Sequence, residues 1–195
     1  MTDAAEAIRA GRLVVLPTDT VYGLCADPEN EAAAAEVGRL KGRSGQQPVA
    51  LLAHTIERLL ERVPELDGRL LRALLPGPYT LILPNPARRY AWLTGERPDT
   101  IGVRVPELPA VAAEVLDEVG AVLATSANAH GGPDPRRVED IPPEIRAACG
   151  ALVHAGELAG TPSTVVDLTG DEPRVLREGA VPAAEALATV SRLRE

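Results

Sequence analysis

Short apolar runs and longer amphipathic segments alternate along this chain, and Gly, Pro and polar residues separate them. The apolar runs are rich in Val, Leu and Ile, which is typical of buried strands. They predict strands over residues 13–16, 49–53, 80–83, 100–105, 121–125, 151–154, 163–168 and 174–176. Apolar residues at helical spacing predict helices over 3–9, 30–40, 55–62, 66–75, 107–119 and 141–148, and a last helix from about residue 182. Asp3 and Asn30 are the predicted N-caps of the first two helices.

The order of these elements predicts an α/β fold. Helices and strands alternate, but their spacing is too irregular for a regular succession of parallel βαβ units. We therefore expect a twisted, open, mixed sheet with helices packed against it. No repeat, low-complexity tract or long linker interrupts the pattern, so residues 1–195 are predicted to form a single domain.

Aromatic residues are scarce and the net charge is negative. Three Tyr, one Trp and no Phe leave few flat side chains on which the bases of single-stranded nucleic acid can stack. A formal net charge of −8 argues against a surface that binds phosphate over its whole extent. The charge is still compatible with one local basic pocket.

Cysteine spacing and hydropathy predict a cytoplasmic protein. Cys25 and Cys149 lie far apart and form no Cys-x-x-Cys or Cys-x-x-His motif, so we interpret both as small buried thiols in a reducing compartment. No apolar run approaches the ~20 residues of a membrane-spanning helix. We therefore expect no contact with a membrane.

Familiar catalytic motifs are missing from the sequence. It contains neither Gly-x-x-x-x-Gly-Lys-Ser/Thr nor Gly-x-Gly-x-x-Gly, which argues against a P-loop and against a dinucleotide-binding fold. His54, His130 and His154 are isolated from one another, so no protein metal site is predicted. His130 follows Ser126 by four residues, but no Gly-x-Ser-x-Gly turn supports a serine hydrolase.

Polar segments instead follow the predicted strands. Residues 17–24 place two threonines, an aspartate and a tyrosine after the first strand, either as a ligand site or as a locally hydrogen-bonded turn. Lys41 is the single lysine among 20 cationic residues and is followed by Arg43 in the stretch KGRSGQQP. In an extended segment both side chains point the same way and can clamp phosphate. Alternatively, they belong to a solvated helix end.

Three further segments add charge and hydroxyl groups. Arg104 lies inside an apolar strand, where its charge requires either an internal carboxylate or an anionic ligand. Small polar residues and glycines at 124–133 form a loop whose N–H groups can surround an anion. Residues 161–167 and Arg177 are the last of these polar segments. The resulting pocket of cations and hydroxyls suits phosphate chemistry that depends on positioning and charge neutralisation.

Short motifs with a fixed order extend from about residue 8 to residue 181: PTDTVYGL, Lys41-x-Arg43, PGPYT, VRVP around Arg104, SAN, PSTVVD and Arg177-x-Gly179. In these motifs the chain resembles the single-domain form of the YrdC-like threonylcarbamoyl-AMP synthases. The resemblance implies a twisted open α/β sheet around a concave basic cavity. It also implies a nucleotidyl transfer that condenses L-threonine, bicarbonate and ATP to threonylcarbamoyl-AMP and pyrophosphate.

The same resemblance implies partners. The threonylcarbamoyl group would pass to position 37 of tRNA, with the help of separate transferase proteins, and give N6-threonylcarbamoyladenosine. ATP is expected as a substrate, and Mg²⁺ is expected to be carried with the nucleotide. A weak contact with RNA or tRNA is expected as well.

Matched motif by motif, the resemblance also assigns site residues. Thr20, Arg104 and Ser126 are expected to bind threonine, and Arg104 would bind its carboxylate. Lys41 and Arg43 are expected to act as the catalytic clamp on the triphosphate. Further expected ATP contacts are Gln47, Ala124, Asn128, Asp134 and Arg177, and the expected cavity-lining residues are Ser163 and Thr164.

Two other functions remain open on the sequence. A concave basic face also suits a non-catalytic module that binds double-stranded RNA or tRNA, although the net charge and the few aromatic residues argue against tight general binding. A related carbamoyl transferase would use a carbamoyl-phosphate-like donor on a different acceptor. Pyrophosphate release that depends on threonine distinguishes the synthase from both alternatives.

Overall fold

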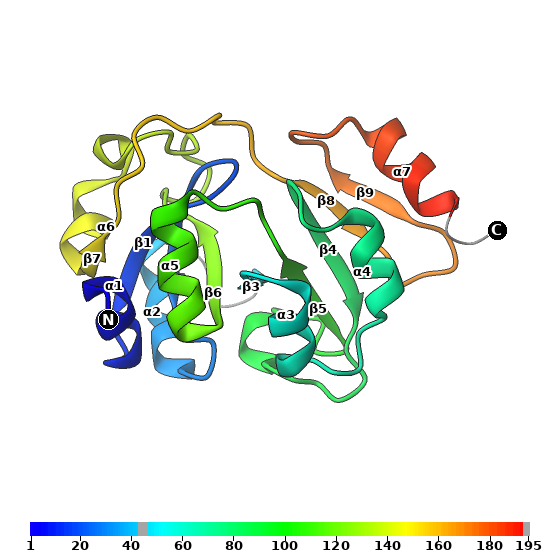
Figure 1. The fold of residues 1–195 in the computed structure, drawn as a ribbon, viewed down its shortest axis with the longest axis horizontal. Helices are drawn as coiled ribbons and strands as arrows, with labels where there is room; N and C mark the ends of the chain where they lie inside the picture. The colour runs from blue at the N-terminus through cyan, green and yellow to red at the C-terminus, as the bar shows by residue number, and fades with distance from the viewer. Residues whose placement is uncertain (43–46, 193–195) are drawn as a thin grey trace.

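A computed structural model describes residues 1–42 and 47–192 and contains one open, twisted sheet (Figure 1). The strands of the described residues lie in the order β7-β1-β2-β6-β3-β5-β4-β8-β9. Their bounds are β1 (Leu13–Pro17), β2 (Tyr22–Ala26), β3 (Ala50–Ala53), β4 (Tyr79–Pro84), β5 (Thr100–Arg104), β6 (Ala121–Ser126), β7 (Cys149–Leu152), β8 (Thr164–Asp167) and β9 (Arg174–Arg177).

The sheet is mixed, as the irregular spacing of its elements predicts. Strand β1 pairs with β7, β3 with β5 and β4 with β8 in parallel, and the remaining neighbours are antiparallel. The chain between β7 and β8 therefore has to cross from one edge strand to the far side of the sheet, as Figure 1 shows. The predicted fold class is confirmed.

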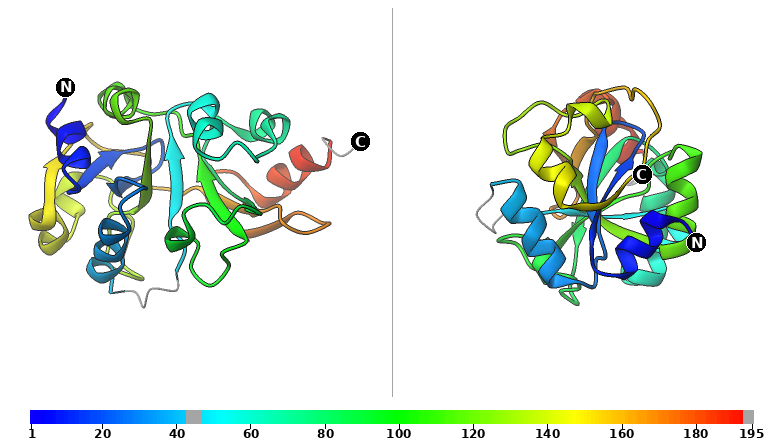
Figure 2. Two further views of the ribbon diagram at one scale, coloured as in Figure 1. Left: turned by 90° about the horizontal axis from the view of Figure 1, so that it is seen from below. Right: turned by 90° about the vertical axis from the view of Figure 1, so that its left-hand side faces the viewer.

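Helices cover both faces of the sheet. They are α1 (Asp3–Arg9), α2 (Glu31–Leu40), α3 (Ile56–Arg62), α4 (Gly68–Leu74), α5 (Ala110–Val119), α6 (Pro143–Ala148) and α7 (Ala183–Ser191), with short 3-10 turns η1 (Ala91–Leu93) and η2 (Val138–Asp140). In the end-on view of Figure 2, α1 and α5 lie on one side of the strands, and α2 and α6 lie on the other. None of the helices in the described residues is long and apolar enough to span a membrane.

Strand periodicity explains the two core layers. In β1, Leu13 and Val15 belong to the larger core cluster, while Val14 and Leu16 pack with residues of α1 and α5 in the smaller one. Successive side chains of a strand point to opposite faces. The smaller cluster covers only part of its face, and the candidate site lies on the part that it leaves open.

Helix boundaries follow capping and proline more closely than the apolar pattern does. The side chain of Thr2, rather than the predicted Asp3, caps α1 by accepting a hydrogen bond from the N–H of Ala5 at 3.2 Å. Asn30 caps α2 as predicted. Helix α5 begins at Ala110 instead of residue 107, because a residue that precedes a proline, as Leu108 precedes Pro109, disfavours the helical conformation.

The two cysteines differ in their surroundings. Cys25 is buried on β2, and burial raises the pKa of its thiol to about 12. Cys149 begins the edge strand β7 and is only half-buried, which corrects the prediction of a buried thiol. Partial burial still raises the pKa of the Cys149 thiol to about 11. Both thiols are therefore protonated and weakly nucleophilic at neutral pH.

Candidate functional site

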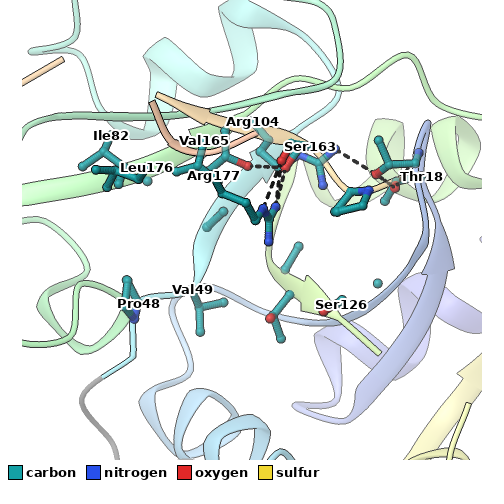
Figure 3. Close-up of a pocket in the computed structure, with 18 of the residues that line it drawn as sticks. Thr18, Pro48, Val49, Ile82, Arg104, Ser126, Ser163, Val165, Leu176 and Arg177 are labelled. Atoms are coloured by element: carbon teal, nitrogen blue, oxygen red, sulfur yellow. Dashed lines mark hydrogen bonds between the residues drawn. The ribbon is translucent and has the colours of Figure 1, made fainter. Parts of the chain in front are cut away.

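A cavity of about 450 Å³ lies on the open part of the sheet face, beyond the cover of α1 and α5 (Figure 3). Its volume falls in the range of ligand pockets, which is ~300–1,000 Å³. Gly23, Ala50, Gly102 and Ala124 line it from four adjacent strands. Because these side chains are small, the centre of the sheet remains accessible from this side.

Arg104 ends strand β5 at the wall of the cavity. Its Nη2 donates a hydrogen bond to Asp19 Oδ1 at 2.8 Å and a long one to Thr20 Oγ1 at 3.4 Å. The structure shows the internal carboxylate, the first of the two predicted partners, beside this buried arginine. An anionic ligand, the second, stays a prediction. The pairing is incomplete, because among the described residues neither Arg104 Nε nor Asp19 Oδ2 has a hydrogen-bond partner.

The electrostatics of this pair follow from its burial. Only 10% of each side chain is exposed. Burial raises the pKa of the Asp19 carboxyl, against the opposing effect of Arg104. Burial also lowers the pKa of the Arg104 guanidinium, and the positive charge of Arg177 lowers it further, while Asp19 raises it. An anion entering the cavity would relieve the repulsion between the two arginines.

Arg177, on β9, is held by neutral groups among the residues that the structure describes. Its Nε and Nη2 donate to the carbonyl oxygen of Ser163 at 3.2 and 2.8 Å, and Nη2 also donates to Ser163 Oγ at 3.2 Å. Ser163 Oγ is in turn 2.8 Å from Thr80 Oγ1. In Figure 3 the Arg177 side chain reaches into the open space of the cavity. Within the described part of the chain Arg177 makes no ion pair, so its charge is available to an anionic ligand.

Lys41 occupies a position that the sequence did not predict. It is the C-cap of α2 in a helical conformation, and Gly42 follows with φ 64°, so the chain turns here instead of running extended. The side chain is 1% exposed and is therefore not a solvated helix end either. Its Nζ donates to the carbonyl oxygens of Ser126 and Asn128 and to Asn128 Oδ1, the last at 2.7 Å.

The Ser126–Asn128 loop is thereby tied to the end of α2. Asn128 Oδ1 also accepts a hydrogen bond from Ser126 Oγ at 2.7 Å. Asn128 Nδ2 donates to the carbonyl oxygen of Gly132 at 2.7 Å and to Asp134 Oδ1 at 3.4 Å. Lys41 thus helps to shape one wall of the cavity from behind.

Three backbone amides of this loop already donate hydrogen bonds within the protein, so the prediction that the loop amides surround an anion does not extend to them. The N–H of Ala127 donates to the Tyr22 carbonyl, that of His130 to the Lys41 carbonyl, and that of Gly132 within the loop. The loop therefore presents side chains, rather than this set of amides, to the cavity.

Most of the predicted site residues meet in the cavity. Seven of them line it: Thr20, Arg104, Ala124, Ser126, Asp134, Ser163 and Arg177. Asn128 and Lys41 lie behind Ser126, and Gln47 is exposed beside Pro48, which lines the cavity. Arg43 lies outside the described residues.

Several residues were missed by the sequence reading. The most important of them is Asp19. The signal that could have identified it is Arg104, since an arginine within an apolar strand needs a buried partner. Arg97 also lines the cavity, but it is bound to Asp167 at 3.1 Å and to Thr169 at 2.9 Å. Other lining residues without a predicted role are Thr18, Thr80, Thr94, Glu96 and Thr100.

Thr164 was predicted to line the cavity, but the structure buries it completely beneath. Its hydroxyl donates to the Val181 carbonyl at 2.6 Å and accepts from the N–H groups of Gly179 and Val181 at 3.1 and 3.0 Å. Thr164 therefore joins β8 to the segment that follows β9.

Replacing Thr164 by valine is expected to lower the free energy of unfolding. The change leaves buried backbone groups without their hydrogen bonds, and each such group costs about 1–3 kcal/mol. Chemical denaturation measures the loss, and Thr164→Ser is the matched control because it keeps the hydroxyl. Equal stability of the valine variant and the wild type would contradict this structural role.

Comparison with known proteins identifies the family of this chain. A family model for the Sua5, YciO and YrdC proteins, described as "Telomere recombination", matches residues 6–179, and the chain belongs to this family. A protein of Mycobacterium tuberculosis is 41% identical over 187 residues, which cover 93% of this chain and 84% of that protein. The threonylcarbamoyl-AMP synthase of Pyrococcus abyssi is 33% identical over 197 residues, which cover 98% of this chain and 57% of that protein.

A solved structure extends the comparison to the fold. The crystal structure of P. abyssi Sua5 complexed with L-threonine superposes with a TM-score of 0.82 at 31% identity, and the match covers 96% of this chain and 56% of that one. The chain thus spans little more than half of the archaeal protein. The predicted family and fold are confirmed, and threonylcarbamoyl-AMP synthase, a nucleotidyl transferase, is the function named for curated members of the family.

Proposed function

We propose that this chain condenses L-threonine, bicarbonate and ATP to threonylcarbamoyl-AMP and pyrophosphate in the cavity of Figure 3. The observation that carries the proposal is the pair of arginines on one small cavity, Arg177 without an ion pair among the described residues and Arg104 incompletely paired. Two such cations, with hydroxyls around them, suit a carboxylate and a polyphosphate together.

The amino acid is proposed to bind at the Arg104 end. Arg104 offers a planar fork of donors that matches a carboxylate. Thr20 and Ser126 add hydroxyls at the same cavity. The L-threonine complex of the archaeal relative supports threonine as the ligand.

ATP is proposed to bind toward Arg177. Arg177 and Arg43 would bind phosphate oxygens, while Ala124, Asp134, Asn128 and Gln47 would contact the nucleoside, Asn128 and Gln47 after local movement toward the cavity. The positive charge of Lys41 lies directly behind the Ser126–Asn128 wall. From this position it would attract the negatively charged nucleotide. Mg²⁺ is part of the proposal as the ion carried by the phosphates, which is its usual mode of binding at ATP sites.

The reaction requires positioning rather than a protein nucleophile. The neutral threonine amine attacks the carbon of bicarbonate, with loss of water, or of the carbon dioxide derived from it, with loss of a proton, and a carbamate forms. A carbamate oxygen then attacks the α-phosphorus, and the bond from this phosphorus to the pyrophosphate oxygen breaks. The cavity supplies proximity, and its cations stabilise the charge that develops on the leaving pyrophosphate.

The product's use is proposed from the family as well. Threonylcarbamoyl-AMP is an activated intermediate, so a transferase must pass the group to tRNA, where it yields N6-threonylcarbamoyladenosine. We propose a cytoplasmic location, separate transferase proteins as partners and at most a weak direct contact with tRNA.

Pyrophosphate release tests this function. With ATP and bicarbonate present, we expect pyrophosphate release to depend on added L-threonine. L-serine should support much less release, because one missing methyl group lowers kcat/KM by ~10–200-fold. Pyrophosphate release that does not depend on threonine would contradict the synthase function. RNA binding that falls steeply with salt, without any pyrophosphate release, would favour the RNA-binding alternative.

A further inference from the structure

Gly179 is the second named residue of the Arg177-x-Gly179 motif, and no role has so far been assigned to it. Its backbone lies against the segment that leads into β8. An alanine Cβ at this position would stand 2.1 Å from the carbonyl oxygen of Pro162, and 2.6 and 2.7 Å from the carbonyl carbon and oxygen of Ser163. All three are backbone atoms, so no side-chain rotation can make room. The close approach therefore requires glycine.

Hydrogen bonds on both sides of this contact hold the two segments together. The N–H of Gly179 donates to Thr164 Oγ1 at 3.1 Å. The N–H of Ala180 donates to the Pro162 carbonyl at 2.9 Å, which is the same oxygen that a side chain at residue 179 would meet. The chain that follows β9 is thus tied along residues 162–164.

A β-bulge decides which face of the sheet Arg177 occupies. Val175 pairs with Val166, and both pack with the larger core cluster. Arg177 pairs with Val165, which lines the cavity. Leu176 is therefore the extra residue of a bulge in β9. Residues paired across a ladder share a face, so without the extra residue Arg177 would be paired one position earlier, on the core side.

The carbonyl group of Ser163 links Gly179 to the orientation of Arg177. Its oxygen accepts the hydrogen bonds from Arg177 Nε and Nη2 that Figure 3 draws. The same oxygen lies 2.7 Å from the place that a Cβ at residue 179 would take. Any side chain there must displace the carbonyl that holds the guanidinium. The bulged register and the direction of Arg177 therefore both depend on the absence of a side chain at residue 179.

We propose that Gly179 is a positioning residue that aims Arg177 at the phosphates of the nucleotide. It does so by letting the end of β9 lie against residues 162–164 in the bulged register, and it acts through Arg177 rather than by contact with the nucleotide. This inference rests on the proposed function, because it takes Arg177 as a phosphate contact.

The first test measures ATP binding to Gly179→Ala by calorimetry, without threonine, so that no turnover occurs. Affinity is expected to fall about tenfold, the value of one charge-assisted hydrogen bond lost when Arg177 is misdirected. Gly170→Ala is the matched control in the connection between β8 and β9. The nearest atom to its Cβ would be 3.7 Å away, an ordinary contact, so its ATP affinity should stay within about twofold of the wild type.

A double-mutant cycle separates positioning from a merely structural role. Arg177→Met alone is expected to weaken ATP binding about 10–100-fold. In that background Gly179→Ala should change ATP affinity by less than about twofold, while its effect on the melting temperature remains. Losses that multiply in the double variant would overturn the proposal, as would wild-type ATP affinity in Gly179→Ala.

Thr164→Val approaches the same contact from the other side, and it decides the matter if Gly179→Ala does not fold. Valine keeps the volume of the buried side chain but removes the acceptor for the Gly179 N–H. ATP affinity should fall severalfold in this variant and should not fall further when Arg177 is already methionine. Unchanged ATP affinity in Thr164→Val would contradict the role of the tie between Gly179 and β8.

The two proposals fail in different ways. ATP binding with the expected coupling between Gly179 and Arg177, but without threonine-dependent pyrophosphate release, would contradict the reaction and leave the role of Gly179 supported. Threonine-dependent release with unaltered ATP binding in Gly179→Ala would contradict the role of Gly179 alone. A wild-type protein that binds no ATP would overturn both proposals.

Discussion

Replacing Arg104 by methionine is expected to raise the KM for L-threonine on the order of 100-fold, because charged contacts with a buried guanidinium are worth about 2–5 kcal/mol. The KM for ATP should change far less, since ATP is proposed to bind through Arg177 rather than Arg104. Steady-state pyrophosphate release with each substrate varied in turn measures the difference. An unchanged KM for threonine would exclude Arg104 as the carboxylate ligand.

The same substitution also affects stability, and this effect has to be separated from binding. Arg104→Met leaves the Asp19 carboxylate buried without its counter-ion, which costs about 3–5 kcal/mol. The double variant Asp19→Asn/Arg104→Met removes the unpaired charge and should recover most of this stability without recovering threonine binding. Recovery of both would show that Arg104 acts only through the fold.

A pH series adds an independent check on Asp19. Burial raises the pKa of this carboxyl above its ordinary value, and loss of Arg104 removes the charge that opposes the rise. A carboxyl with a raised pKa in the folded state favours folding when protonated and loses that contribution as the pH rises through the folded-state pKa. The stability deficit of Arg104→Met should therefore shrink as the pH is lowered, and the double variant should show no such trend.

Replacing Lys41 by methionine is expected to lower turnover on the order of 100-fold or more, the effect typical of losing an aligned electrostatic group at an active site. The ammonium holds three oxygens of Ser126 and Asn128, and each buried oxygen left unsatisfied costs about 1–3 kcal/mol. The Ser126–Asn128 wall should therefore loosen, and the melting temperature should fall together with the rate.

Arg39→Met is the matched control for Lys41→Met. Arg39 belongs to the same helix and is paired with Glu36 on the surface, so both stability and turnover should stay close to those of the wild type. Arg43→Ala provides the contrast, since a phosphate clamp should lose turnover without loss of stability. Full activity of Lys41→Met would refute the role of Lys41 at the site. Full activity of both Lys41→Met and Arg43→Ala would refute the predicted phosphate clamp.

Sequence reasoning recovered the candidate site through strand ends and charge. An arginine within an apolar strand demanded a partner, and the motifs around it placed Thr20, Ser126 and Arg177 in one cavity, as the structure does. Strand β2 was not predicted, because it is buried throughout and carries Gly23, so it shows neither alternation nor an apolar run. Lys41 was predicted as half of an extended clamp, because sequence spacing does not reveal that the chain turns at Gly42.

The sequence by itself determined the α/β class, most strands and helices, and the family. These properties depend on local hydrophobic periodicity, on caps and turns, and on short motifs, all of which are readable along the chain. The tertiary structure alone decided that Arg104 meets Asp19, that Lys41 is buried behind the cavity wall, and that Thr164 lies beneath the cavity. It also decided that the Ser126 hydroxyl donates to Asn128 Oδ1. These contacts join residues brought together by the sheet or by tight turns, and their directions depend on how each hydrogen-bonding group is satisfied, which no local pattern encodes.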